Sequence, residues 1–182
     1  MYNQKILNAI KYALMHDIGS ARNYLVLGSF DGLLLSISII MGSVFYNIST
    51  ADMRTVIISG LVGTSISSLW NAFVVELSQK KEELEELERQ LMRSLKGTVY
   101  DYSGKISAVV SGISHGVSPF LGLLPFEVFS YTHEITYTML VSLILLFSMG
   151  LLYGNEIKQK IRTSVVMILA GVIAVAIIYV IS

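Results

Sequence analysis

The sequence has 182 residues, of which 53% are hydrophobic and only 14% are charged. Soluble domains usually carry about 25% charged residues because they must cover their surface with polar groups, so this composition excludes an ordinary soluble domain. The 13 basic and 13 acidic residues cancel, so the net charge gives no reason to expect a nucleic-acid partner. There is no cysteine, which excludes disulfides and thiolate metal sites.

Five stretches contain the about 20 mainly apolar residues that a helix needs to cross the hydrocarbon core of a bilayer. Lipid offers the backbone no hydrogen bonds, so each stretch should be a helix rather than a strand. The third stretch is the weakest, because it contains His115 and two prolines. The sequence therefore predicts an all-α integral membrane protein with five transmembrane helices. The five stretches cover residues 24–46, 55–77, 106–129, 135–153 and 163–181.

The basic residues predict the orientation of these spans. Twelve of the 13 fall on one side of an alternating five-span topology, and Arg54 falls on the other. Because basic loops favour the cytoplasm, we expect a cytoplasmic N-terminus and an external C-terminus. The location would be the cell membrane of a prokaryote, or a vacuolar or other organelle membrane of a eukaryote. The twelve are Lys5, Lys11, Arg22, Lys80, Lys81, Arg89, Arg93, Lys96, Lys105, Lys158, Lys160 and Arg162.

Two segments are predicted to lie outside the bilayer core. Residues 1–20 place apolar side chains at helical spacing opposite lysines, which is typical of an amphipathic helix on the inner membrane surface or of the start of a longer first helix. Residues 78–95 contain no proline or glycine and extend the second helix into the cytoplasm, to a total of about 40 residues. Gly97 is its expected end. The expected organisation is an N-terminal amphipathic segment (1–23), spans one and two (24–77), a short acidic cytoplasmic insert (78–104) and spans three to five (105–182).

Asp31 is a candidate functional residue, because an ionisable side chain within a span is costly and rarely faces lipid. Gly28 and Gly32 form a pair of small residues that lets another helix approach beside the carboxylate. We expect that helix to belong to a second copy of the chain. Alternatively, Asp31 only hydrogen-bonds to a neighbouring helix or lies close enough to the surface to reach water.

The acidic run KKEELEELERQL is a candidate metal-binding segment. Glutamates three or four residues apart share one face of a helix and can converge on one cation. Oxygen ligands of this kind suit hard or borderline divalent ions. The other interpretation is a solvated face on which the glutamates pair with Lys80, Lys81 and Arg89. The candidate ligands are Glu82, Glu85, Glu86 and Glu88.

Three further polar residues belong to the predicted spans or their ends. Glu76 stands at the membrane boundary, on the helix that leads from the second span to the acidic run, and Asn71 precedes it. His115 lies in the third span, where a histidine can relay protons, bind metal or simply hydrogen-bond to another helix.

Residues 20–44, SARNYLVLGSFDGLLLSISIIMGSV, resemble the first span of the vacuolar iron transporter family. The small-residue second span with its acidic extension, the LGLLPF stretch and the basic link into the last span are also similar to that family. The chain therefore looks like a short, prokaryotic-type member. The first-span motif of the family is matched here, in order, by Arg22, Leu27, Gly28, Asp31, Gly32, Leu33 and Gly42.

This resemblance implies a homodimer that exports Fe²⁺ or Mn²⁺ from the cytoplasm in exchange for protons. The metal is then the transported ion and not a prosthetic group. The resemblance places Asp31 in the translocation path at the dimer interface, and makes Asn71 and Glu76 further path residues. It makes Glu76 and the glutamates of the acidic run candidates for collecting metal.

Two departures from the family weaken parts of this expectation. The family usually offers a methionine about one turn before the glutamate that ends the second span, whereas Asn71 and Ala72 stand here, so the path lacks a thioether and should be less selective. The cytoplasmic insert is also short, so metal collection there should be weak.

Two other classes of function remain compatible with the sequence. One is a membrane-embedded interaction or assembly protein in which Asp31 and the leucines of the acidic helix serve only oligomerisation. The other is an intramembrane hydrolase that uses a serine and His115. No zinc-binding HExxH motif or nucleophile elbow occurs, so we expect no enzyme.

Overall fold

The computed structural model describes residues 2–154 and 156–181, and all regular structure within them is helical. Five helical stretches are long and apolar enough to cross a membrane: α2, α3, α6, α7 and the continuous run from α4 to α5. This confirms the predicted fold class, and the chain is a multi-pass integral membrane protein. The elements are α1 (Tyr2–His16), α2 (Ile18–Phe45), α3 (Thr50–Leu91), α4 (Val99–Val117), the 3₁₀ helix η1 (Ser118–Gly122), α5 (Leu123–Thr132), α6 (Ile135–Leu152) and α7 (Ile157–Ile181).

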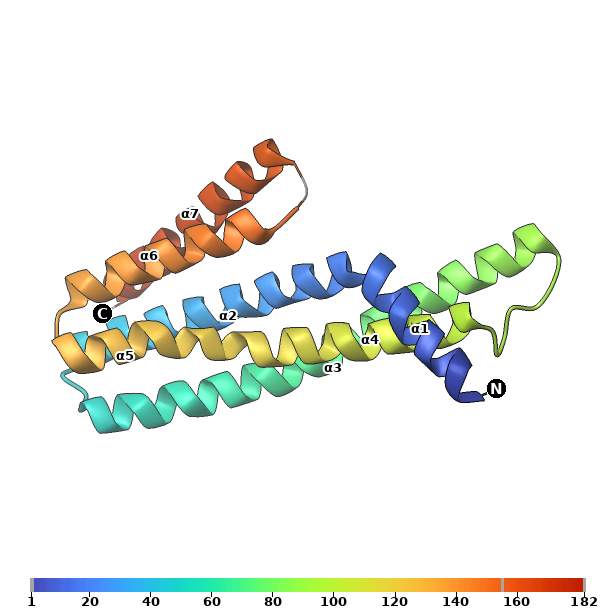
Figure 1. Ribbon diagram of the computed structural model, residues 1–182. Helices are drawn as coiled ribbons and strands as arrows, with labels where there is room; N and C mark the ends of the chain where they lie inside the picture. The colour runs from blue at the N-terminus through green and yellow to red at the C-terminus, as the bar shows by residue number, and fades with distance from the viewer. Residues whose placement is uncertain (1, 155, 182) are drawn as a thin grey trace.

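The helices form an elongated bundle with a hairpin beside it. α2, α3 and the run from α4 to α5 lie side by side, whereas α6 and α7 form a hairpin that packs on α2 (Figure 1). Apolar side chains join the bundle at the end far from the N-terminus, where Ile40, Ile57 and Phe126 are fully buried. Leu33 on α2 and Leu146 on α6 are the buried contacts that attach the hairpin. Burial of such side chains and close packing hold the helices in this arrangement.

The second span and its extension form one helix of 42 residues, as predicted. It begins after Ser49, whose hydroxyl accepts a hydrogen bond of 3.1 Å from the Asp52 amide. It ends at Leu91, so the expected end at Gly97 is wrong. Met92 adopts the left-handed conformation (φ 49°) that glycine usually adopts at a helix end, and the chain turns there.

The third span is interrupted where the prolines occur. α4 gives way to η1 at Ser118, and Pro119 occupies the first turn of this 3₁₀ helix, where its missing N–H costs no helical hydrogen bond. The backbones of α2 and η1 approach closely at this point, because a Cβ atom on Gly122 would collide with the Gly32 carbonyl. The interruption therefore provides the close contact between the first and third spans.

The N-terminal segment is a separate helix, because the chain bends at Asp17 between α1 and α2. Ala9 and Ala13 are buried as α1 crosses the end of the bundle and packs on α4. Leu7, Leu14 and Met15 are exposed, which is the pattern expected of a helix on a membrane surface. Of the two interpretations from sequence, the continuous longer first helix is therefore wrong.

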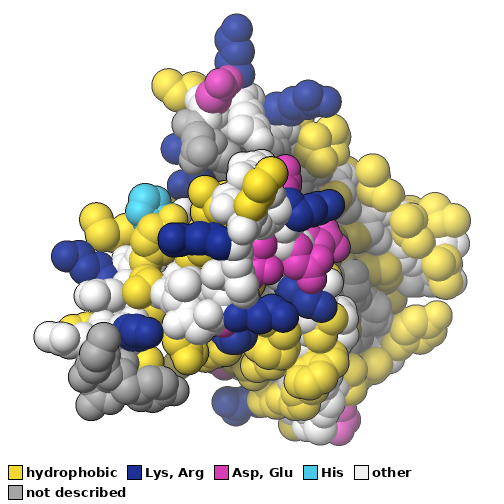
Figure 2. Space-filling view, turned by 90° about the vertical axis from the view of Figure 1, so that its right-hand side faces the viewer, with side chains coloured by type: hydrophobic (Ala, Val, Ile, Leu, Met, Phe, Trp, Pro, Cys, Tyr) yellow, Lys and Arg dark blue, Asp and Glu magenta, His cyan; other side chains and the backbone are white. Residues whose placement is uncertain are grey.

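Lysine and arginine side chains gather at the end of the bundle where the N-terminus lies, with acidic side chains among them (Figure 2). The turn between α3 and α4 and the turn between α6 and α7 lie toward the same end (Figure 1). The positive-inside rule would place this end in the cytoplasm. We refer to it below as the basic end.

Candidate ion site inside the membrane

Glu76 is a buried carboxylate where three helices meet near the basic end. Its side chain lies on α3, and the residue is only 2% exposed. The Ser20 hydroxyl of α2 donates a hydrogen bond of 2.7 Å to Oε2, and the Ser107 hydroxyl of α4 donates one of 3.1 Å to Oε1. These bonds offset part of the large cost of burying a carboxylate. They also connect the first three spans through one side chain.

An ion-pair network lies one helical turn beyond Glu76. The Lys80 ammonium is 2.9 Å from Asp17 Oδ1 and 2.9 Å from Glu83 Oε2. It therefore ties the bend between α1 and α2 to the extension of α3. A cavity of about 120 Å³ lies beside this network, with the polar residues Asp17, Lys80, Glu83 and Ser103 in its lining. This cavity gives water or ions a place to collect beside Lys80, one helical turn from Glu76.

Asp31 lies beside His115, the second ionisable residue within the spans that the sequence singled out. His115 Nε2 is 3.9 Å from Asp31 Oδ2, and the ring centroids of His115 and Tyr24 are 5.5 Å apart. The imidazole is only 13% exposed, whereas the Asp31 side chain is 50% exposed. Neither imidazole nitrogen makes a hydrogen bond to any residue that the structure describes. The pair therefore joins an exposed carboxylate on α2 to an imidazole whose two buried nitrogens have unused donor and acceptor capacity among the described residues.

One face of α4 connects the two carboxylates. Ser107, Ser111 and His115 follow one another at intervals of four residues, which places them on one face about 6 Å apart along the helix. Ser107 contacts Glu76, and His115 contacts Asp31. Ser111 between them is fully buried, and its hydroxyl has no hydrogen-bond partner among residues 2–154 and 156–181. Buried polar atoms of this kind usually bind water or an ion, so this face can form a polar path between Glu76 and Asp31.

The two glycines beside Asp31 do not face a second copy of the chain, which corrects the expectation from sequence. A Cβ atom on Gly28 would collide with Ser118 and His115, and one on Gly32 would collide with the Pro119 backbone. The small-residue pair therefore does admit another helix, as predicted, but that helix is the third span of the same chain. The sequence pattern shows that a close approach occurs, but not which helix makes it.

Asn71 does not join Glu76, contrary to the expectation that both line one path. Asn71 is exposed on α3, whereas Ala72 and Glu76 face the interior. A separation of five residues turns the two side chains far apart around a helix of 3.6 residues per turn. Ala72, one turn before Glu76, is the residue that faces the interior at this level.

The acidic run does not assemble a metal site within one chain, which is a further correction. Glu82, Glu85 and Glu86 are exposed, and the Lys81 ammonium lies 3.8 Å from Glu85. Glu88 serves the turn after α3, because its Oε1 accepts hydrogen bonds from the Leu95 amide (2.6 Å) and the Ser94 hydroxyl (3.0 Å). Among the described residues, no three side chains of His, Asp or Glu converge on one point. The solvated, salt-bridged face is the interpretation that the structure supports.

Several residues of this site were not singled out by the sequence. Ser20, Ser107 and Ser111 were missed, although serines recur on α4 at positions 103, 107 and 111 with the spacing of one helix face. That regular spacing in an otherwise apolar span was the available signal. Nothing in the sequence indicated that this face lies against Glu76, because the contact depends on the register between α3 and α4.

Comparison with known proteins gives one informative relative. The chain is 26% identical over 168 residues to the uncharacterized protein MJ0645 of Methanocaldococcus jannaschii, which covers 87% of this chain and 86% of the relative. The similarity thus extends along nearly the whole of both chains. No family model matches the chain, and no solved structure matches it.

Proposed function

We propose that this protein transports divalent metal ions, Fe²⁺ or Mn²⁺, out of the cytoplasm in exchange for protons, and that it works as a homodimer. The observation that carries the proposal is the contact of one face of α4 with both intramembrane carboxylates, through Ser107 to Glu76 and through His115 to Asp31. Ionisable residues within spans are rare, and substrate and ion pathways are among the functions that they commonly mark.

The chemistry of these side chains suits the proposed ions. Carboxylate oxygen and imidazole nitrogen are common ligands of Fe²⁺ and Mn²⁺, and both bind metal only in the deprotonated form, so metal and protons compete for them. Metal binding at Asp31 and His115 would therefore be coupled to proton release. Alanine and not methionine faces the interior at position 72, one turn before Glu76, so this position offers no thioether to distinguish between the two ions.

The homodimer is supported by the exposure of Asp31. Its side chain is 50% exposed in a single chain, about 16 Å along α2 from Ser20 at the basic end. A carboxylate facing hydrocarbon at that depth is costly, and a second copy of the chain would cover it. The resemblance of residues 20–44 to the vacuolar iron transporter family agrees with this arrangement.

The test is metal uptake into proteoliposomes with an imposed proton gradient. We expect wild-type protein to move Fe²⁺ and Mn²⁺ with release of protons, and Asp31→Asn to reduce both signals to near background. Asp52→Asn is the matched control, because Asp52 is exposed at the start of α3, where its hydrogen bonds with Ser49 are local to the helix end. If the Asp31→Asn variant transports both ions at the wild-type rate, the proposed mechanism is wrong. An absence of flux from wild-type protein that still dimerises would favour the assembly protein instead.

A further inference from the structure

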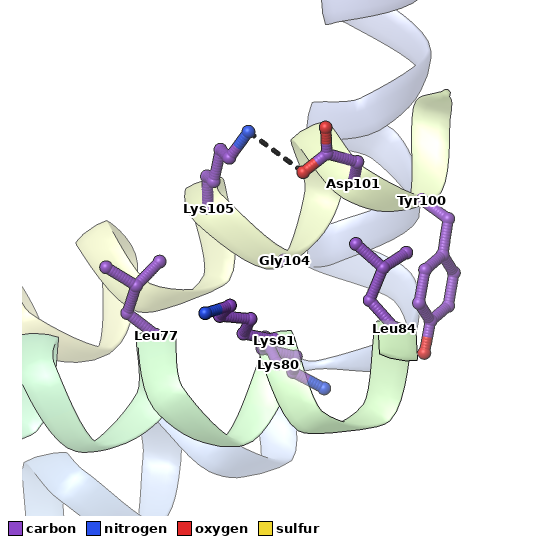
Figure 3. A pocket seen from close by; sticks show the side chains of 8 residues that line it. All are labelled: Leu77, Lys80, Lys81, Leu84, Tyr100, Asp101, Gly104 and Lys105. Atoms are coloured by element: carbon purple, nitrogen blue, oxygen red, sulfur yellow. Dashed lines mark ion pairs between the residues drawn. The ribbon is translucent and has the colours of Figure 1, made fainter. Parts of the chain in front are cut away.

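A cavity near the basic end lies between α3 and α4, and its lining contains none of the path residues Glu76, Ser107, Ser111, His115 and Asp31. Its volume is about 260 Å³, which is slightly below the range of about 300–1,000 Å³ that holds drug-sized ligands. Apolar atoms form most of its wall, and four of its lining residues, Lys80, Lys81, Asp101 and Lys105, carry charges (Figure 3). The apolar wall consists of Leu77, Leu84 and Tyr100.

The cavity lies at the level of the lipid headgroups. Leu77 is the last residue of the second apolar span, and Lys81 follows one turn later, about 6 Å further out along α3. Lys105 immediately precedes the third apolar stretch on α4. The headgroup layer extends about 5–8 Å beyond the hydrocarbon core on each side. Both ammonium groups can therefore reach the layer in which lipid phosphates lie.

The charge of the cavity favours an anion. Three lysines and one aspartate line it, and Lys80 among them is already bound by Asp17 and Glu83. The Lys105 ammonium lies 2.8 Å from Asp101 Oδ1, the ion pair drawn as a dashed line in Figure 3. The Lys105 side chain is nevertheless 58% exposed. Lys81 is 75% exposed, and its contact with Glu85 is long, at 3.8 Å. Lys81 and Lys105 thus have ammonium groups available to a further acceptor.

We propose that this cavity binds the headgroup of an anionic phospholipid, with the phosphate between Lys81 and Lys105 and the glycerol and upper acyl chain against Leu77 and Tyr100. Basic pockets between helices on the cytoplasmic side are suited to anionic headgroups, and the apolar wall here suits the chain that follows the phosphate. The site is independent of the proposed metal transport. It would fix the extension of α3 against the start of α4.

The test compares lipid retention by the purified full-length protein in detergent that contains phosphatidylglycerol or phosphatidylcholine, measured by native mass spectrometry. We expect wild-type protein to retain phosphatidylglycerol in preference to phosphatidylcholine. Each lysine near an anionic lipid surface contributes roughly fivefold to binding, so Lys81→Gln with Lys105→Gln should weaken retention by more than about tenfold. Lys81→Arg should keep it.

The matched control is Lys158→Gln with Lys160→Gln, because these residues carry the same charge on α7 and do not line the cavity. This pair should retain phosphatidylglycerol as wild type does. If both double variants lose phosphatidylglycerol retention equally, the proposal is overturned, because the lipid is then attracted to the whole basic surface and not to this cavity. The proposal would also be overturned if inorganic phosphate raised the thermal stability as much as phosphatidylglycerol does, because the glycerol and acyl chain would then contribute nothing to binding.

Lys81→Gln alone is the second variant, because Lys105→Gln also removes the ion pair with Asp101. We expect this single change to weaken retention of phosphatidylglycerol about fivefold.

Discussion

The Ser107 hydroxyl of α4 donates a hydrogen bond of 3.1 Å to the buried carboxylate of Glu76 on α3. Ser107→Ala removes this donor and leaves Glu76 with a poorly compensated oxygen. We expect a loss of about 1–3 kcal/mol in the free energy of unfolding, measured by thermal unfolding in detergent. The control is Ser103→Ala, because the Ser103 hydroxyl donates to the Tyr100 carbonyl of its own helix and not to a carboxylate. Equal stability of the two variants would show that the bond to Glu76 contributes little.

The close approach of α2 and η1 makes Gly32 sensitive to substitution. Gly32→Ala places a methyl group against the Pro119 backbone, which cannot move aside as a flexible side chain can. We expect destabilisation of about 1–3 kcal/mol or more. Gly42→Ala in the same helix meets nothing within 4 Å and should instead stabilise by about 0.5–1 kcal/mol. Thermal unfolding of both proteins tests this, and a stable Gly32→Ala would contradict the packing described here.

The orientation of the chain is testable by cysteine labelling, because the natural sequence contains no cysteine. Gln90 and Ile48 are both exposed, on the α3 extension and in the turn between α2 and α3, respectively. With the basic end in the cytoplasm, an impermeant maleimide added to intact cells should label Ile48→Cys and not Gln90→Cys. Labelling of Gln90→Cys from outside would reverse the proposed orientation and the direction of export.

The exposed glutamates of the α3 extension are expected to have little influence on metal transport. Glu82, Glu85 and Glu86 do not converge, so replacing all three with glutamine should leave the metal concentration for half-maximal flux within about twofold of wild type. Glu88 is left in place because it holds the turn after α3. A tenfold increase in that concentration would restore the acidic run as a metal-collecting segment, with ligands shared between two chains.

The spans and the long second helix were predictable, because hydropathy and the absence of helix breakers are properties of contiguous residues. The partners of polar and small residues were not. Gly28 and Gly32 indicated a close helix contact, but the same pattern serves a contact within one chain or between two. Asn71 and Glu76 looked adjacent along the sequence, yet five residues rotate them to different faces. Ser107 was missed because its role depends on the register of α4 against α3, which no local pattern encodes.

The α6–α7 hairpin gives the protein a two-part construction. Within the described residues α6 packs on α2, α5 and α7, and α7 packs on α2 and α6, whereas the backbone of neither helix comes close to α3 or α4. Every side chain assigned to the candidate ion site therefore belongs to the first part of the chain. Fragments 1–133 and 134–182 made separately in one membrane should reassociate, and a tag on the shorter fragment should recover the longer one. Leu33 and Leu146 form the buried contact between the two fragments. Leu146→Asp should therefore prevent the tagged shorter fragment from recovering the longer one, while the hydrogen bonds of Glu76 stay in place.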